Sequence, residues 1–297
     1  MSVSLWCEEG GRGQPGSQLR APWDPCVSGD RVIQRLLQME LRYLPSPLYT
    51  SLIQREPHRR EELAKWILEV CCESGCDESV FPLSVSLLDR FLSVSLSLPV
   101  SPLCLSAACI LIASKLTESN TVSADDLCSS ADFGFTTKDL WDMERVVLAT
   151  LRWDVAAVTP QDFIPHFLSA LEEKNDGQTE TEAFLSTLRR HSDTLVAMCV
   201  CDSRFLGTPA SLVSAAALNS AIRGLGKRGP QLGDVATVLA AHCRTDVAVL
   251  QYYTDMIEGA LTERLRSGLG EREGEQKDGE MENERSSTPT DLREISF

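Results

Sequence analysis

The chain has 297 residues, of which 43% are hydrophobic and 24% are charged, and its formal net charge is −15. This composition is typical of a globular protein with room for two ordinary domains. The negative charge argues against a general binder of nucleic acid or of membrane surfaces, because both are anionic. No apolar run approaches the roughly 20 residues of a membrane-spanning helix, and the N-terminus lacks the pattern of a signal peptide.

The 11 cysteines lie mostly inside apolar runs of helical spacing, and none of them forms a C-x-x-C pair. Structural zinc sites need paired ligands at fixed spacing. We therefore expect no metal and no cofactor. The cysteines are interpreted as small buried hydrophobes in a reducing compartment, which favours the cytoplasm and the nucleus.

The first elements in chain order are a flexible segment and two helices. Residues 10–29 are rich in Gly, Pro and Ser, and the segment 1–29 is predicted to be flexible. Helical periodicity starts at Asp30, and Pro45 and Pro47 are predicted to end that helix. A second helix is predicted to end near Gly75. Its apolar stripe, which has the spacing of a core-facing helix, holds Leu63, Trp66, Ile67, Val70 and Cys71.

Four more helices are expected in the first half. The third spans Phe81–Leu92, and the fourth begins at Ser101, where Ser caps and the following Pro takes the first turn. Leu103–Ala113 is apolar nearly all round, which predicts a central, buried helix. A short helix starts at Ser123, and Leu140–Leu151 carries a further apolar stripe.

After a break at residues 154–158, a second group of five helices begins with the cap signature of Thr159 and Pro160. Strand signals are nearly absent. The predicted fold is all-α, with two tandem five-helix bundles preceded by an N-terminal helix. The predicted domains are residues 30–155 with that helix, residues 156–265, and a disordered acidic tail at 266–297. The five helical stripes are Phe163–Leu171, Phe184–Cys201, Ser211–Arg223, Leu232–Cys243 and Asp246–Leu265.

Four of the first-half helices each place one charged residue in an otherwise apolar face. The residues are Arg60, Asp89, Lys115 and Glu144. A charge on such a face is costly unless it is paired or kept for a partner. The pattern favours a helical scaffold with a built-in protein-docking site over a catalyst.

Six segments resemble the cyclin box of the D-type cyclins. The resemblance runs from about Asp30 to Leu265 and is densest through Phe163. The tail that ends in Ile295-Ser-Phe297 faintly suggests the third type. The segments are Arg60–Val70, Cys71–Cys76, Leu87–Leu92, Ala107–Leu116, Trp141–Trp153 and Trp153–Phe163.

The resemblance implies a non-enzymatic regulatory subunit that activates cyclin-dependent kinases 4 and 6 and promotes the G1/S transition. It implies that the complex is directed to the retinoblastoma protein. It also implies kinase inhibitor proteins and a ubiquitin ligase as partners, and a location in nucleus and cytoplasm. Partners of other kinds, nucleic acid and membrane, are not expected.

Carried over by position, Lys115 and Glu144 match the charged pair that cyclins present to the kinase's mobile regulatory helix. A cation and an anion held rigidly by neighbouring helices can hydrogen bond the backbone groups of that helix. The alternative is a local structural salt bridge. Arg60 and Asp89 match the family's buried structural ion pair, whose loss typically costs about 3–5 kcal/mol.

Leu63 and Trp66 match the family's exposed hydrophobic patch, which captures short substrate motifs. This chain departs from the family pattern at Arg59, a position where relatives usually have Met. Docking through the patch is therefore an open question, and the alternative is that Leu63 and Trp66 belong to the core.

Two motifs lie near the chain ends. Leu5, Cys7 and Glu9 form an L-x-C-x-E pattern, in which residues i and i+2 of an extended peptide project to one side. The resemblance implies that this motif docks onto the retinoblastoma pocket. Thr288 precedes a proline in the acidic tail, and the resemblance implies that its phosphorylation drives nuclear export and ubiquitin-dependent destruction.

Two other functions are alternatives to that of a kinase regulatory subunit. A cyclin-fold transcription factor binding nucleic acid or other proteins would share the helical repeats, but the net charge of −15 disfavours nucleic acid. An enzyme built on a helical bundle lacks support from any acid/base or metal constellation in the sequence. The G-x-G-x-x-G pattern at Gly224–Gly229 follows a helix instead of a strand, so it is interpreted as a loop that ends a helix.

Overall fold

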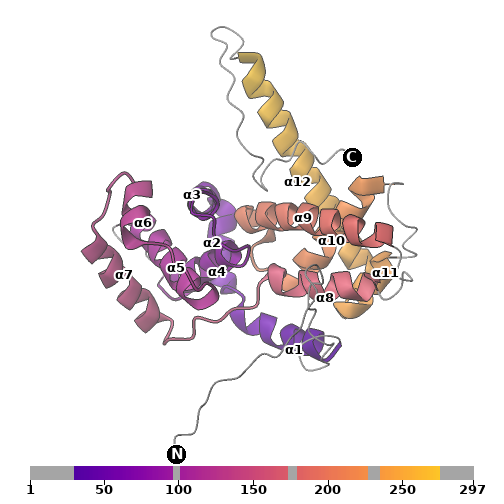
Figure 1. Cartoon of the computed structure of the whole chain (residues 1–297), viewed down its shortest axis with the longest axis horizontal. Coiled ribbons are helices and arrows are strands. Elements are labelled where there is room, and N and C mark those ends of the chain that lie inside the picture. Colours follow the sequence, from indigo (N-terminus) through magenta and orange to yellow (C-terminus); the bar gives the residue numbers. More distant parts are fainter. Residues whose placement is uncertain (1–29, 96–100, 173–178, 227–234, 275–297) are drawn as a thin grey trace, which may run out of the picture.

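The structure is a computed structural model that describes residues 30–95, 101–172, 179–226 and 235–274. Every regular element in these ranges is a helix, so the prediction of an all-α fold is confirmed. Two bundles follow one another along the chain, with α2–α7 in the first and α8–α12 in the second (Figure 1). Short 3₁₀ turns lie at Leu41–Tyr43 and Ser203–Phe205. The helices are α1 (Asp30–Glu40), α2 (Pro47–Arg55), α3 (His58–Glu73), α4 (Val80–Val94), α5 (Pro102–Thr117), α6 (Ala124–Ser130), α7 (Thr137–Thr150), α8 (Pro160–Glu172), α9 (Thr179–Cys201), α10 (Ala210–Leu225), α11 (Val235–His242) and α12 (Val247–Gly274).

Helix α5 forms the centre of the first bundle, where it packs against α3, α4, α6 and α7. Its residues from Cys104 to Ser114 are all buried, as the continuous apolar run predicted. The start of the helix also follows the predicted signature, because the hydroxyl of Ser101 accepts a hydrogen bond from the backbone N–H of Cys104 at 3.3 Å. The helix is therefore held on every side, and its ends are fixed relative to its neighbours.

Helix α10 has the corresponding position in the second bundle, between α8, α9, α11 and α12. Its small buried residues Ala215, Ala216 and Ala217 allow these helices to approach closely. The bundle begins at α8, where the backbone N–H of Thr159 donates to the carboxylate of Asp162 at 2.7 Å. This is the cap signature that the sequence predicted for the start of the second half.

Helix α1 packs on the second bundle, although it precedes the first bundle in the chain (Figure 1). Ile33 is 3% exposed and belongs to the same core as Phe163, and Leu36 and Leu37 pack against that core. At the end of the helix, the buried carboxylate of Glu40 accepts hydrogen bonds from the backbone N–H and hydroxyl of Ser211, at 2.8 and 2.9 Å. The sequence grouped this helix with residues 30–155, but its packing partners lie beyond residue 160.

The structure corrects two details of the predicted helices. Pro45 and Pro47 were predicted to end the first helix, but Pro47 also starts an additional helix, α2, which Ser46 caps by accepting from the N–H of Tyr49 at 3.2 Å. Helix α2 thus precedes the five predicted helices of the first bundle, α3–α7. Helix α12 continues to Gly274, beyond the predicted boundary at 265, because extending a formed helix costs little once it is nucleated.

None of the helices in the described ranges is long and apolar enough to cross a membrane.

Candidate protein-docking site

Lys115 and Glu144 meet at the surface of the first bundle. Lys115 lies in the last turn of α5, and Glu144 lies in the middle of α7, which packs along α5. The Nζ atom of Lys115 donates to Oε1 of Glu144 over 2.5 Å. The Lys115 side chain is 46% exposed and that of Glu144 is 13% exposed, so the cation is open to solvent while the anion is nearly covered.

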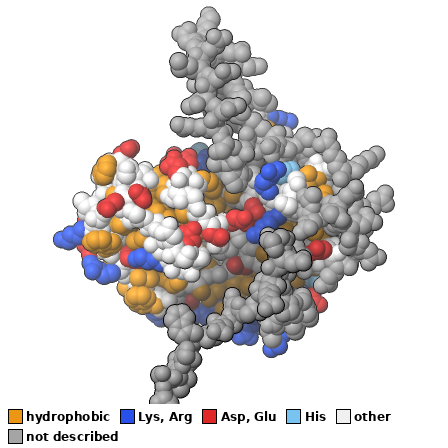
Figure 2. Space-filling model, in the orientation of Figure 1, with side chains coloured by type: hydrophobic (Ala, Val, Ile, Leu, Met, Phe, Trp, Pro, Cys, Tyr) orange, Lys and Arg blue, Asp and Glu red, His pale blue; other side chains and the backbone are white. Residues whose placement is uncertain are grey.

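Two exposed apolar side chains lie close in sequence to the residues of this ion pair. Leu116 is 53% exposed beside Lys115, and Trp141 is 52% exposed one turn before Glu144 on the same face of α7. Figure 2 shows hydrophobic side chains at the surface of the first bundle, interspersed with acidic and basic ones. Large exposed hydrophobic groups next to a fixed charge pair are features of a protein-binding surface.

Arg60 and Asp89 form a second, buried pair between α3 and α4. Their side chains are 4% and 7% exposed. Two bonds join them side by side, from Nε to Oδ1 at 3.2 Å and from Nη2 to Oδ2 at 2.8 Å. The hydroxyl of Tyr49 also donates to Oδ1 of Asp89 at 2.8 Å. The carboxylate therefore has three donors and the arrangement is that of a structural ion pair.

The guanidinium of Arg60 also reaches the second bundle. Its Nη1 atom donates to the backbone carbonyls of Val200 and Cys201 at the end of α9, at 2.7 and 2.9 Å. Burial by itself lowers the pKa of Arg60, but the charge and hydrogen bonds of Asp89 outweigh it and the pKa is raised. A permanently charged Arg60 thus ties α3, α4 and α9 together.

No sequence pattern predicted the two carbonyls that Arg60 contacts, because every residue has a backbone carbonyl. It also missed a neighbouring link, in which the Glu61 carboxylate accepts from the backbone N–H of Ser203 at 3.0 Å. The only sequence signal for this hydrogen bond was the acidic residue Glu61 next to Arg60 on α3, and its partner Ser203 lies 142 residues away.

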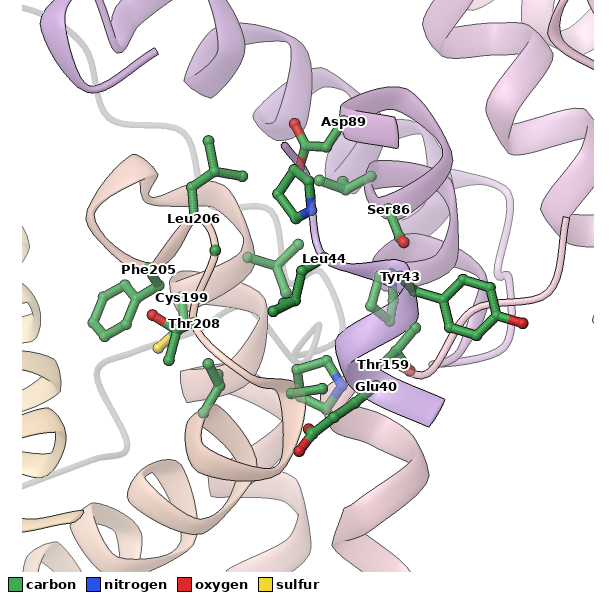
Figure 3. Close-up of a pocket in the computed structure, with 18 of the residues that line it drawn as sticks. Glu40, Tyr43, Leu44, Ser86, Asp89, Thr159, Cys199, Phe205, Leu206 and Thr208 are labelled. Atoms are coloured by element: carbon green, nitrogen blue, oxygen red, sulfur yellow. The ribbon is translucent and has the colours of Figure 1, made fainter. Parts of the chain in front are cut away.

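A small cavity lies next to the buried pair, between the two bundles (Figure 3). Glu40, Tyr43 and Asp89 line it from the first half of the chain, and Phe205 and Leu206 line it from the segment after α9. The cavity has a volume of about 110 Å³. The cavity lies at the interface between the two bundles and is too small for a drug-sized ligand.

Leu63 and Trp66 have different environments on α3. Leu63 is only 9% exposed and belongs to the core of the first bundle. Trp66 is half-buried, and its indole N–H donates to the carbonyl of Ser130 at 3.4 Å. Arg59 is exposed on the same helix. Of the predicted patch, Trp66 therefore offers the larger free surface, and Leu63 contributes mainly to the core.

The remaining predicted site residues, Leu5, Cys7, Glu9 and Thr288, lie outside the described residues. Within the described ranges, no group of three or more His, Cys, Asp or Glu residues is arranged to hold a metal ion.

Two family models match the chain, one after the other. The model for the N-terminal domain of cyclins matches residues 31–156, and that for the C-terminal domain of cyclins matches residues 158–269. The chain belongs to the cyclin family.

Curated relatives narrow this to the D-type cyclins, as the sequence resemblance indicated. G1/S-specific cyclin-D1 of Danio rerio is 36% identical over 94% of this chain and 95% of its own length. G1/S-specific cyclin-D3 of Homo sapiens is 38% identical over 89% of this chain and 88% of its own. G1/S-specific cyclin-D2 of Gallus gallus is 36% identical over 94% and 96%. The three types are similarly distant, so identity alone does not separate them.

The solved structures support the cyclin fold. A viral cyclin from herpesvirus saimiri superposes with a TM-score of 0.58 at 20% identity, over 78% of this chain and 97% of the viral protein. In this D-type cyclin, the fold places the Lys115–Glu144 pair on the outside of the N-terminal box and the Arg60–Asp89 pair at its junction with the C-terminal box.

Proposed function

We propose that this D-type cyclin is a non-enzymatic regulatory subunit that binds and activates cyclin-dependent kinases, specifically cyclin-dependent kinases 4 and 6, at the G1/S transition. The observation that carries the proposal is the ion pair of Lys115 and Glu144. A half-exposed lysine ammonium and a nearly buried carboxylate, 2.5 Å apart, are held on two packed helices and flanked by exposed apolar side chains.

The pair suits the docking of a helix from another protein. The Lys115 ammonium has three donors, so it can reach backbone carbonyls of a partner while it stays near Glu144. The Glu144 carboxylate can accept from backbone N–H groups. Both are charge-assisted hydrogen bonds, and the α5–α7 packing holds the two groups in place before binding.

Activation follows from differential binding. The cyclin surface shifts a kinase towards its active arrangement only as far as it binds that arrangement more tightly than the inactive one. Moving such an equilibrium from 1:99 to 99:1 requires about 5.5 kcal/mol of differential affinity. A few charge-assisted bonds of about 1.5–3 kcal/mol each, together with burial of Leu116 and Trp141, are of the right size.

The proposal is tested with Lys115→Ala and Glu144→Ala in the full chain. Both variants should keep the helical circular dichroism of the native chain but lose at least tenfold in affinity for the kinases and in kinase activation. Lys65→Ala, which changes an exposed lysine on α3 outside the α5–α7 surface, is the matched control and should bind normally. Full activation of both kinases by Lys115→Ala and Glu144→Ala would contradict the proposal.

We also propose that Leu5, Cys7 and Glu9 dock the cyclin onto retinoblastoma-family proteins, and thereby direct the kinase to that substrate. The support is the alternate spacing, which in an extended peptide places Leu5 and Cys7 in adjacent apolar pockets and Glu9 at a donor. A peptide of residues 1–12 should bind the retinoblastoma pocket in calorimetry, and a Glu9→Ala peptide should bind more weakly. Absence of heat with the native peptide would refute this part.

The third part of the proposal concerns turnover and location. Phosphorylated Thr288 is proposed to mark the chain for nuclear export and for a ubiquitin ligase, so that the protein is found in both nucleus and cytoplasm. Thr288→Ala should then lengthen the half-life of the protein in a cycloheximide chase and retain it in the nucleus. An unchanged half-life would count against it.

Trp66 is proposed to contribute to docking of substrates and of kinase inhibitor proteins, with Arg59 in the place of an apolar neighbour. Arg59→Met should therefore strengthen capture of short hydrophobic motifs, whereas Trp66→Ala should weaken it. Equal capture by all three proteins in a fluorescence-polarisation assay would exclude this surface.

The second candidate, a cyclin-fold transcription factor, predicts a different result. The net charge of −15 and the scattered basic side chains on the face shown in Figure 2 weigh against nucleic acid. A gel-shift assay at low salt distinguishes the two functions, because we expect no retardation of DNA.

A further inference from the structure

Four cysteines, Cys201 of α9 and three from the end of α3, line a cavity between the two bundles. Cys71 and Cys72 lie near the end of α3, and Cys76 follows that helix. The cavity has a volume of about 510 Å³ and lies between α3, the start of α4, and α9. It is large enough to admit small reagents from solvent to these thiols.

The end of α3 brings the backbones of Cys71 and Cys76 together. The backbone N–H of Cys76 donates to the carbonyl of Cys71 at 2.9 Å, and that of Gly75 donates to Cys72 at 3.2 Å. These two bonds define a Schellman motif, in which the chain folds back on the last turn of its own helix. Gly75 has φ 64°, a left-handed conformation that glycine adopts without steric strain.

The first and last residues of this motif are Cys71 and Cys76, so its backbone hydrogen bond holds the two residues together at the end of α3. Cys71 is 4% exposed, whereas Cys76 is half-buried. The thiol of Cys76 raises the pKa of Cys71, and the thiol of Cys71 lowers the pKa of Cys76, although burial and the carboxylates of Glu118 and Asp77 oppose the latter change. Cys76 is thus the more accessible and the more acidic thiol of the pair.

We propose that Cys71 and Cys76 form a peroxide-sensitive dithiol, with Cys76 as the attacking thiol and Cys71 as the resolving thiol. The thiolate of Cys76 attacks one oxygen of hydrogen peroxide, the O–O bond breaks, and hydroxide leaves and takes up a proton as water. This step gives Cys76 sulfenic acid. The Cys71 sulfur then attacks the sulfenic sulfur, the S–O bond breaks, and the departing hydroxide takes the Cys71 proton as a second water. Two thiols and one peroxide give one disulfide and two waters.

The backbone bond between Cys71 and Cys76 explains why this pair is selected over Cys72. Cys72 is adjacent to Cys71 in sequence and lines the same cavity, but the Schellman motif joins Cys71 to Cys76. Cys109 is fully buried within α5, so it provides an internal reference that peroxide should not reach. The dithiol does not depend on the kinase-docking surface, and its test is independent of the proposed function.

The test is peptide mapping of the full native chain after a titration with hydrogen peroxide. Free thiols are blocked with iodoacetamide before unfolding, and the tryptic peptide of residues 66–90 is analysed by mass spectrometry. The expected product has lost two hydrogens, carries one alkyl group on Cys72, and fragments as a Cys71–Cys76 disulfide. It should form at peroxide doses that leave Cys109 reduced.

Three variants assign the roles. Cys71→Ser should accumulate sulfenic acid on Cys76, which dimedone traps, and Cys76→Ser should form neither product at Cys71. Cys72→Ser is the matched control and should form the disulfide at the native rate. A native chain in which Cys76 stays reduced until Cys109 oxidises would overturn the proposal, as would a disulfide that requires Cys72. The native chain and Cys72→Ser decide the matter even if a variant of the buried Cys71 does not fold.

Discussion

Replacement of Asp89 by alanine tests the structural role of the buried ion pair most directly. The change leaves the Arg60 guanidinium, 4% exposed, with two backbone carbonyls but no counter-charge, and it leaves the Tyr49 hydroxyl without its acceptor. Removal of one partner of a buried pair costs about 3–5 kcal/mol. Because domains are stable by only about 5–15 kcal/mol, this is a large fraction of the total.

The expected loss corresponds to a fall in melting temperature of roughly 10 °C for a chain of this size. It should be measured by differential scanning calorimetry and by urea denaturation followed at 222 nm. Arg59→Ala is the matched control, because Arg59 is an exposed arginine next to Arg60 on α3. It should melt within about 2 °C of the native chain, since surface substitutions typically change stability by less than 0.5 kcal/mol.

A second variant separates charge from shape. Asp89→Asn keeps the volume of the side chain and one carbonyl acceptor, so it should lose the charge contribution while it retains part of the hydrogen bonding. We expect its stability to lie between those of Asp89→Ala and the native chain. The reasoning is refuted if Asp89→Ala melts as the native chain does, because an uncompensated buried guanidinium cannot then be present.

Three other changes test separate parts of the fold. Burial, followed by the charge of Glu78, raises the pKa of Asp193 to about 7; the folded state therefore binds the extra proton between about pH 4 and 7, and stability falls as pH rises through that window. Asp193→Asn should remove this fall in urea denaturation at pH 5 and pH 8, and a pH profile unchanged from that of the native chain would contradict it. Arg152 has φ 53° at the end of α7, so Arg152→Gly should stabilise the chain by up to about 1 kcal/mol, and a lower melting temperature would show that the side chain matters more than the strain. Glu40→Ala leaves the backbone N–H and hydroxyl of Ser211 without their acceptor, so its urea midpoint should fall by the equivalent of about 1–3 kcal/mol, whereas Glu40→Gln should lose less.

Local signals in the sequence predicted the helices well. Apolar periodicity located the centres of the helices, and the caps at Ser101 and Thr159 located two of the starts. The same signature at Ser46 and Pro47 indicated a cap or turn next to the end of the first helix, but it did not predict the separate helix α2. Proline both terminates one helix and occupies the first turn of the next, so its meaning depends on the residues that follow.

Pairings between distant elements were only partly predictable. Charges on apolar faces identified Arg60, Asp89, Lys115 and Glu144 as residues that need a partner, and the structure joins them in the two expected pairs. The sequence contained no information that Arg60 also contacts backbone carbonyls of α9. Periodicity describes one helix at a time, whereas packing between helices depends on the three-dimensional arrangement.

The thiol pair shows a further limit of sequence reasoning. Cys71 was interpreted as a small buried hydrophobe, and its spacing of five residues from Cys76 matches no helical face. The backbones of the two residues come together because Gly75 takes a left-handed conformation. A glycine one residue before a cysteine at a helix end was the available signal.

The position of α1 has a consequence for how the polypeptide is made. Ile33, Leu36 and Leu37 leave the ribosome before the whole first box, but the core that covers them includes residues of α8, α10 and α12. During synthesis this apolar stripe stays exposed to solvent until more than a hundred further residues have been made and the second bundle can fold against it. A fragment that stops at residue 156 would keep the stripe exposed to water. A fragment that starts at residue 158 would lack helix α1, so the part of the second core that α1 covers would be exposed. Expression of either box alone is therefore expected to give aggregation, which chaperones or the other box in trans should relieve.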